Sequence, residues 1–194
     1  MDAKIALVGG GLLLVGGYLF FKSRQNQSDA NKTDNATADI DNPITQQALK
    51  LYNMLGVERS SLTGNYGLAI FHNIPEDKVL NLMLEITDWN GLQDKFKKLC
   101  NNEYSIAKAL SDGLDEDEYQ LAIKYASAKK VVTTTTATVI VYVGYVPMAK
   151  TVAANTILGA YKSETSTAYT FINAVEDDDK EVLASISKSQ AKLV

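Results

Sequence analysis

Two residue types that build many reactive sites are almost missing from this sequence. One cysteine and one histidine, Cys100 and His72, occur among its 194 residues. A single cysteine excludes a disulfide within the chain, and a zinc site would need carboxylates for almost all of its ligands. A cysteine–histidine catalytic pair would require these two residues to meet in space. We therefore expect no metal ion, no other cofactor and no thiol-based catalytic site, and we expect Cys100 to be a small buried hydrophobe.

A marked excess of positive charge is also missing. The chain carries 19 Lys and Arg against 23 Asp and Glu, which gives a formal net charge of −4. Proteins that bind nucleic acid need clustered basic residues, because counterion release from the phosphates supplies most of the affinity. No nucleic-acid partner is therefore expected. The nearest basic runs are short and are predicted to lie on solvated helix surfaces, and they comprise Lys95, Lys97, Lys98, Lys129 and Lys130.

The first forty residues contain little that a folded core could use. Ile5–Phe21 is wholly uncharged and apolar, and as a helix it would span roughly 26 Å, slightly less than the ~30 Å hydrocarbon layer. A secretory signal peptide is the alternative, but the run is longer than a usual signal core and ends in FFKSR instead of a small-residue cleavage pattern. We predict a transmembrane anchor over residues 1–22, followed by a flexible polar linker over residues 23–42.

The predicted anchor carries a stripe of glycines. They recur one heptad apart, so they share one side of a helix, where small residues let a second membrane helix approach closely. The alternative is that glycine is simply common in membrane spans. Lys22 and Arg24 follow the apolar run, and the positive-inside rule then places the folded part on the cytoplasmic side. The stripe consists of Gly9, Gly10, Gly16 and Gly17.

Residues 43–130 show helical periodicity. Asn42-Pro43 is a typical helix start, with a capping side chain before proline. Apolar residues then recur at helical spacing in five short segments, and Asp115 and Glu118 are spaced as a capping box for the last segment. The acidic run at 115–118 lacks the glycine turn and the spaced ligands of a calcium loop. We predict a compact bundle of five helices.

Beyond Val131 the apolar period changes from helical to two. Apolar residues alternate with threonines in 133–145, which indicates a half-buried strand. Residues 131–149 contain no charge, so a second membrane span is an alternative, although the threonines and the β-branched majority favour a strand. Residues 131–194 are predicted to form a small antiparallel SH3-like β-barrel. The further strands are expected at 156–161, 168–175, 181–186 and 191–194, with Asp177–Asp179 in a turn.

The helical half resembles a single annexin-type five-helix repeat. The glycine-rich calcium loop of annexins is not visible in residues 56–75, so calcium-dependent lipid binding is not implied. The resemblance rests on Ala48–Tyr52, Glu76–Thr87, Trp89–Leu99, Asn102–Leu110 and the helix with acidic residues in its first turn.

The strand half is similar to the small barrel that follows such repeats in proteins of phages that infect Bacteroidetes. The similarity lies in Ala149–Gly159 and Leu183–Val194. It implies a virion structural component of an icosahedral, tailless phage with an internal membrane. The expected partners are then a lipid bilayer and capsid or neighbouring structural proteins, in multiple copies.

Three functions are compatible with these features. The first is a membrane-anchored structural protein that tethers a lipid bilayer to a protein shell. The second is an envelope-anchored module that recognises a peptide or a cell-wall fragment. The third is a wall-cleaving hydrolase that uses Glu76, Glu85 or Glu103, but no pair of carboxylates stands at a spacing that this chemistry demands. We expect a structural protein and not an enzyme.

Overall fold

The computed structural model of the chain describes residues 41–70, 72–144, 146–176 and 180–194. The predicted anchor with its glycine stripe, nearly all of the linker and Asp177–Asp179 lie outside these residues. None of the helices in the described ranges is both long enough and apolar enough to cross a membrane.

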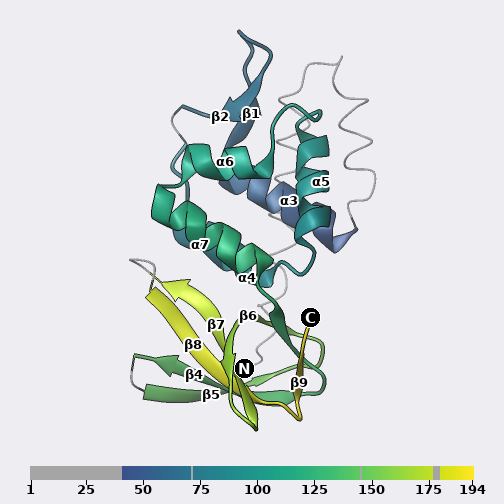
Figure 1. Cartoon of the computed structure of the whole chain (residues 1–194). Helices are drawn as coiled ribbons and strands as arrows, with labels where there is room; N and C mark the ends of the chain where they lie inside the picture. The colour runs from purple at the N-terminus through teal and green to yellow at the C-terminus, as the bar shows by residue number, and fades with distance from the viewer. Residues whose placement is uncertain (1–40, 71, 145, 177–179) are drawn as a thin grey trace, which may run out of the picture. The chain divides into compact units, whose positions relative to one another are not determined.

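Five helices are present in the described part of the chain (Figure 1), each placed where helical periodicity predicts one. They are short, so tertiary packing of their apolar faces supplies most of their stability. They are α3 (Pro43–Met54), α4 (Glu76–Glu85), α5 (Trp89–Leu99), α6 (Ile106–Gly113) and α7 (Glu116–Ser127).

The strands form two sheets. A two-stranded hairpin joins β1 to β2, and a larger antiparallel sheet of seven strands has the order β5-β4-β8-β7-β6-β3-β9. The hairpin consists of β1 (Val57–Arg59) and β2 (Tyr66–Leu68). The larger sheet consists of β3 (Lys130–Thr133), β4 (Ala137–Val143), β5 (Val146–Val152), β6 (Ile157–Glu164), β7 (Ala168–Glu176), β8 (Lys180–Ser187) and β9 (Ala191–Leu193).

The chain divides into two compact units that alternate along the sequence. The first unit contains the described residues up to His72 together with Asn90–Ala109. The second contains Asn73–Trp89 and Leu110–Val194. The chain therefore passes from one unit to the other three times, and α4 belongs with the large sheet although α3 and most of α5 do not.

In the first unit, α3 begins as its sequence predicts. The Asn42 side chain accepts a hydrogen bond from the Ile44 amide at 2.9 Å, and Pro43 occupies the first turn. The helix buries an apolar stripe, and the ring of Tyr52 packs against that of Phe96 on α5 with 6.0 Å between the ring centroids. The β1–β2 hairpin follows, with Val57 opposite Leu68.

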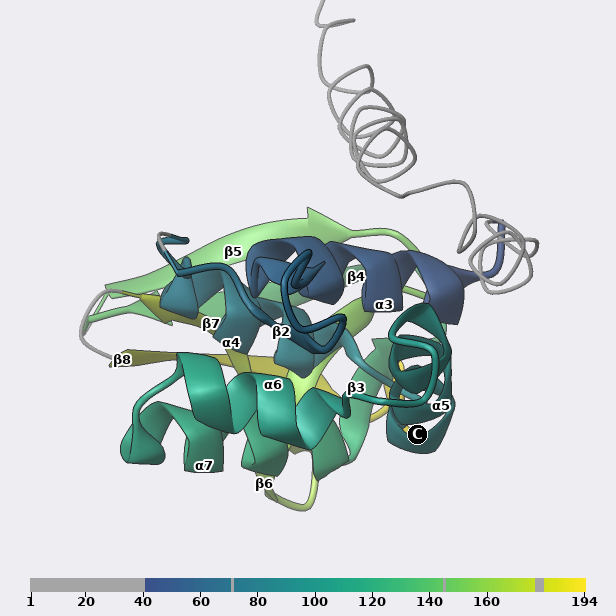
Figure 2. The same cartoon turned by 90° about the horizontal axis from the view of Figure 1, so that it is seen from above.

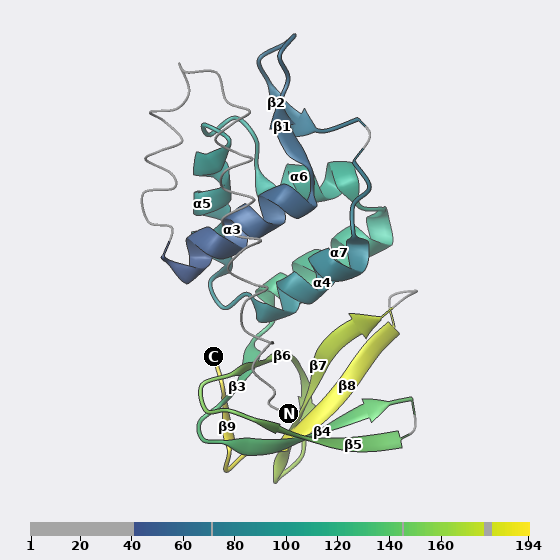
Figure 3. The same ribbon diagram turned by 180° about the vertical axis from the view of Figure 1, so that it is seen from behind.

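In the second unit, α4 and α7 lie side by side, and α4 packs on β6 and β7 (Figures 1 and 3). The predicted capping box of α7 is confirmed: the Asp115 carboxylate accepts from the Glu118 amide, and the Glu118 carboxylate accepts from the Asp115 amide, each at 3.0 Å. Two reciprocal bonds satisfy donors that a helix start otherwise leaves unpaired.

One side chain joins α4 to the sheet. Asn81 accepts a hydrogen bond from the Val175 amide at 2.9 Å and donates to the Val175 carbonyl at 2.8 Å. It also donates to the Asp77 carbonyl at 2.7 Å. Val175 follows a register shift between Ile172 and Ala174, where β7 bulges against β8. Val175 keeps Glu181 as its partner in β8, whereas the pairing of β7 with β6 ends at Ile172, so the amide of Asn81 pairs backbone groups that β6 no longer reaches.

The large sheet curves around a core of its own. Phe171 of β7 lies in this core and is fully buried. Its neighbour Ile172 points to the opposite face, because side chains alternate along a strand, and it is buried as well. The sheet thus has two buried faces in this region. The core consists of Val131, Ala137, Val139, Leu158, Phe171, Ala184, Ile186 and Ala191.

The predicted fold class is correct in being α+β but wrong in its parts. The prediction joined an N-terminal transmembrane helix and a polar linker to a five-helix annexin-like bundle over 43–130 and a small antiparallel SH3-like barrel over 131–194. The structure has an open sheet that ends at β5 and β9, and α4 packs against it. The predicted transmembrane helix cannot be seen in the described residues, because its position lies outside them.

The physical reason for the error is that helical periodicity identifies a buried face without identifying what covers it. The apolar stripe of α4 meets α7 and two strands instead of completing a bundle. The prediction also missed β5, since its exposed residues lack the alternation that reveals a strand. Within 131–149 the described residues form parts of β3, β4 and β5 with short connections, as the alternation in β4 predicts, and not a helix.

Candidate functional site

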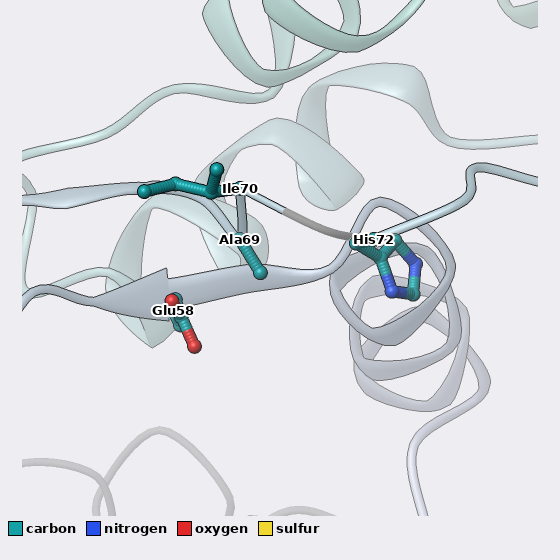
Figure 4. Close-up of a pocket in the computed structure, with 4 residues that line it drawn as sticks. All are labelled: Glu58, Ala69, Ile70 and His72. Atoms are coloured by element: carbon teal, nitrogen blue, oxygen red, sulfur yellow. The ribbon is translucent and has the colours of Figure 1, made fainter.

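The single histidine lies in a shallow pocket of the first unit. The pocket is lined by Glu58, Ala69, Ile70 and His72. In Figure 4 the Glu58 and His72 side chains lie on either side of Ala69 and do not converge. The Nε2 atom of His72 is 2.8 Å from the Met54 carbonyl oxygen, at the last residue of α3. His72 therefore closes the end of a helix.

Cys100 is fully buried, as predicted. Burial raises the pKa of its thiol to about 12, and the nearby Glu103 contributes to the increase. Burial likewise raises the pKa of the neighbouring Tyr52 far above its ordinary value, with a further contribution from Cys100. A thiol with such a high pKa is protonated at neutral pH and is a poor nucleophile.

Of the three glutamates considered for catalysis, Glu76 meets a second carboxyl group among the described residues. It shares a hydrogen bond with Glu118, which is 8% exposed. Burial raises the pKa of Glu118, and Glu76 and Asp115 raise it further, against the lowering effect of the Asp115 backbone amide. The Glu118 carboxyl is also held by its capping bond. The pair is therefore fixed at the helix starts.

Glu85 and Glu103 do not join that pair. Glu85 ends α4 in the second unit, whereas Glu103 lies between α5 and α6 in the first unit, and both are exposed. Within the described ranges, no three His, Cys, Asp or Glu side chains gather closely enough to hold a metal ion.

Two charged residues of the second unit, Glu181 and Lys130, make structural contacts that the sequence analysis did not predict. Glu181 on β8 pairs with Lys162 on β6, and it accepts a hydrogen bond from the Tyr125 hydroxyl on α7 at 3.1 Å. Burial raises the pKa of Glu181, but these two partners and Lys124 lower it more, so the net shift is downward. The carboxylate thus connects α7 to two strands.

Lys130 corrects the prediction that the basic runs lie on the surface. Its side chain is 1% exposed and donates hydrogen bonds to the carbonyl oxygens of Tyr125 and Ala128 at the end of α7. A cation there compensates the negative end of the helix. Burial lowers the pKa of Lys130 to about 8.

The most distinctive exposed surface belongs to β4 and β5, which we call the β4–β5 ribbon (Ala137–Val143 with Val146–Val152). It pairs over its whole length, from Ala137 opposite Val152 to Val143 opposite Val146. The register of β4 with β8 covers only Ile140 and Val141. Figures 1 and 3 show the strand pair β4–β5 diverging from the strand pair β7–β8.

The outer half of the β4–β5 ribbon exposes large apolar side chains. Val146 is 62% exposed and Met148 is 56% exposed, and Tyr142 and Val143 on β4 are exposed as well. Every residue of β5 except Val152 is exposed. Lys150 is the only charged residue of the β4–β5 ribbon.

This concentration of apolar surface distinguishes the β4–β5 ribbon from scattered exposed residues such as Leu62 and Ile70, which need no partner. β5 is also at the end of the strand order, so its outer edge has no paired strand in the described part of the chain. Figure 2 shows β5 and β6 on opposite sides of the sheet. An uncovered apolar edge strand is a site for protein association.

The sequence contained one sign of this surface. Residues 131–149 have no charge, and the notable length of this run raised the alternative of a membrane span. It could not show that the first part of the run would be buried in β3 and β4 while the last part would be exposed in β5.

Comparisons with known proteins identify no relative of this chain. No family model matches the chain, and no curated protein and no solved structure matches it significantly. The function must therefore be inferred from the residues and the structure alone.

Proposed function

We propose that this chain is a membrane-anchored structural protein that links a lipid bilayer to a protein assembly, such as the shell of a virion. The observation that carries the proposal is the exposed apolar surface of the β4–β5 ribbon. It gives the folded part an association surface, while the side chains that enzymes use for catalysis serve other contacts. His72 closes α3, Cys100 is buried, and Glu118 caps α7.

The sequence supplies the second half of the proposal. Ile5–Phe21 is apolar enough to enter a bilayer, and the polar residues 23–42 give reach between the bilayer and the folded part. Anchoring in a bilayer concentrates the copies, so a modest interaction of each ribbon becomes effective in an assembly. The function is that of a mechanical link. The N-terminal segment lies in the bilayer, the polar linker spans the distance to the assembly, and the folded part contacts protein on the cytoplasmic or capsid-facing side.

Membrane retention tests the lipid half. The full chain should stay with vesicles after an alkaline carbonate wash, and the double change Leu13→Arg and Leu14→Arg should release it. The matched control, Asn31→Arg with Asn35→Arg, adds the same charge to the polar segment and should leave retention unchanged. Release of all three proteins, or a mature chain that begins after residue 21, would refute the anchor.

Association with a protein shell tests the other half. The protein should co-purify with intact particles at a fixed copy number and should require detergent for its release. Val146→Asp with Met148→Asp should abolish this incorporation without affecting membrane retention, because both side chains are exposed. Normal incorporation of the double variant would exclude the β4–β5 ribbon as the contact.

The free edge of β5 also favours a second candidate, an envelope-anchored module that binds an extended peptide. Such a peptide would add a strand beside β5, with its backbone supplying the affinity. The two candidates differ in where the protein resides. Free monomers in a host envelope that bind peptides or muropeptides would support the module and would contradict the structural protein.

A further inference from the structure

The free edge of β5 is complementary to itself. We propose that β5 pairs antiparallel with β5 of a second copy of this chain, across a two-fold axis at Ala149. The inference deepens the proposed function and rests on it in one respect, since it names a second copy as one protein partner of the β4–β5 ribbon. The argument depends on which backbone groups of β5 face outward.

Proline determines those groups. Pro147 lies opposite Tyr142 in the ladder between β4 and β5. Opposing pairs in an antiparallel ladder alternate between those that exchange hydrogen bonds and those that do not. Because proline has no N–H to donate, Pro147–Tyr142 must be a pair without hydrogen bonds. Pro147, Ala149 and Thr151 therefore direct their remaining backbone groups toward the free edge.

These groups restrict the register. With the axis at Ala149, this residue lies opposite its own copy and can exchange two hydrogen bonds with it, and each Thr151 amide can reach the Pro147 carbonyl of the other chain. An axis at Met148 would instead place Pro147 opposite Ala149 on both sides of the axis, and each of these pairs would lose one hydrogen bond because proline has no amide to donate. An axis at Lys150 would place two lysines directly opposite each other, which is unfavourable.

The side chains agree with the same register. Met148 of each chain would lie opposite Lys150 of the other, at a position where the Cα atoms are roughly 4.5 Å apart. The aliphatic stem of a lysine can cover an apolar neighbour while its ammonium group stays in water. Val146 and Met148, now 62% and 56% exposed, would lose water contact. No like charges are brought together, because Lys150 is the only charge on the β4–β5 ribbon.

The pairing closes on itself. Both copies use the same edge, so no second β5 edge remains for a third chain. At the other end of the sheet, β9 is only three residues long (Ala191–Leu193), and very short edge strands are poor templates for pairing. The expected product is a dimer with one continuous sheet and not a fibre.

A charge exchange at residue 148 tests both the association and its register. The full chain in a non-ionic detergent should dimerise in sedimentation equilibrium. Met148→Glu should tighten the dimer on the order of fivefold, because each new carboxylate faces Lys150 of the other chain, and Met148→Lys should weaken it by a similar factor. Position 148 is exposed, so both variants should fold, as circular dichroism can verify.

Disulfide formation provides a second readout. Ala149→Cys should oxidise to a covalent dimer, since paired residues on a two-fold axis have Cα atoms about 5.5 Å apart. Thr151→Cys, the matched control on the same strand, should not, because it would lie roughly 14 Å along the sheet from its own copy. The native Cys100 is buried in both variants and should not react.

Three results would overturn the proposal. They are a wild-type chain that stays monomeric at high concentration, equal effects of Met148→Glu and Met148→Lys, and equal cross-linking at residues 149 and 151. Association through the glycine stripe of the predicted anchor, instead of through β5, would make the effects of Met148→Glu and Met148→Lys equal. None of these outcomes bears on vesicle retention or particle incorporation, so failure of the dimer and failure of the proposed function can be told apart.

Discussion

At the scale of single residues, Lys130 is the least expected feature, because it is a buried cation whose bonds go to backbone carbonyls at the end of α7. Burial lowers its pKa to about 8, whereas the pKa of a lysine in the unfolded chain is about 10.4. Below pH 8 both states are protonated and the burial cost is fully present. Between these two pKa values the unfolded chain binds more protons than the folded chain does. The free energy of unfolding therefore increases as the pH rises.

The corresponding prediction concerns Lys130→Met. The wild-type free energy of unfolding should contain a rising contribution of up to about 1.4 kcal/mol per pH unit between pH 8 and 10, and the variant should lack it. Urea unfolding at several pH values measures the difference, in which titrations common to both proteins cancel. The exposed neighbour gives the control, Lys129→Met, which should retain the wild-type slope. A pH-independent difference between wild type and Lys130→Met would contradict the assignment.

Replacing Gly56 by alanine should destabilise the protein for two separable reasons. Its φ angle is +62°, and an added Cβ would lie 2.3 Å from the Cγ and Cδ2 atoms of His72. Gly56→Ala should therefore cost more than the about 1–2 kcal/mol that a left-handed backbone alone imposes. Gly64→Ala should show only that backbone cost, since its φ is +74° but its Cβ would meet nothing closer than 3.9 Å.

A double-mutant cycle separates the two reasons. In the His72→Gly background, the cost of Gly56→Ala should fall to that of Gly64→Ala, because the His72 ring and its Cβ, which would lie 2.7 Å from the added Cβ, are both gone. Chemical denaturation followed by circular dichroism supplies the four free energies. An undiminished cost in that background would mean that His72 does not close the end of α3.

At the scale of elements, the junction between α4 and β7 depends on Asn81. Its amide bonds both backbone groups of Val175 next to the bulge and also reaches the Asp77 carbonyl. Asn81→Ala should destabilise the protein by about 2–3 kcal/mol, since it leaves these backbone groups without their partner. Asn90→Ala on the exposed surface of α5 is the matched control and should change stability little. Equal effects of the two changes in urea unfolding would disprove the coupling.

The elements also show what local sequence signals can achieve. Asn42 and the Asp115–Glu118 box were recognisable because a cap involves residues only two or three positions apart. The alternation in β4 was recognisable because one of its faces is buried. β5 was missed for the converse reason, since it is an edge strand that is exposed throughout most of its length and so has no alternation to read.

At the scale of the whole molecule, the order of the chain does not match the order of the folded units. The chain passes between the units at residues 72–73, 89–90 and 109–110, so neither unit is one continuous segment. A cut at residue 130 would separate α4 and α7 from the sheet. Ile172, which is 3% exposed and lies on the face opposite to the sheet's own core, would then become accessible to water.

We therefore expect that neither fragment, 43–130 or 131–194, folds cooperatively on its own. Each should show narrow amide dispersion in NMR spectra and a broad thermal transition, whereas the uncut chain should show dispersed signals and a sharp transition. Mixing the fragments is the control, because complementary pieces of one core can reassociate. A sharp transition of the isolated 131–194 fragment would show that the sheet does not need its helices.

The sequence alone determined where the helices begin, that the second half is built of strands, that Cys100 is buried, and that one long stretch has no charge. These properties depend on residues close together in the chain. The tertiary structure decided that α4 packs on the sheet, that Lys130 is buried, and that β5 is exposed at an edge. These outcomes depend on which distant faces meet, and an apolar stripe or a lysine carries no information about the partner that will cover it.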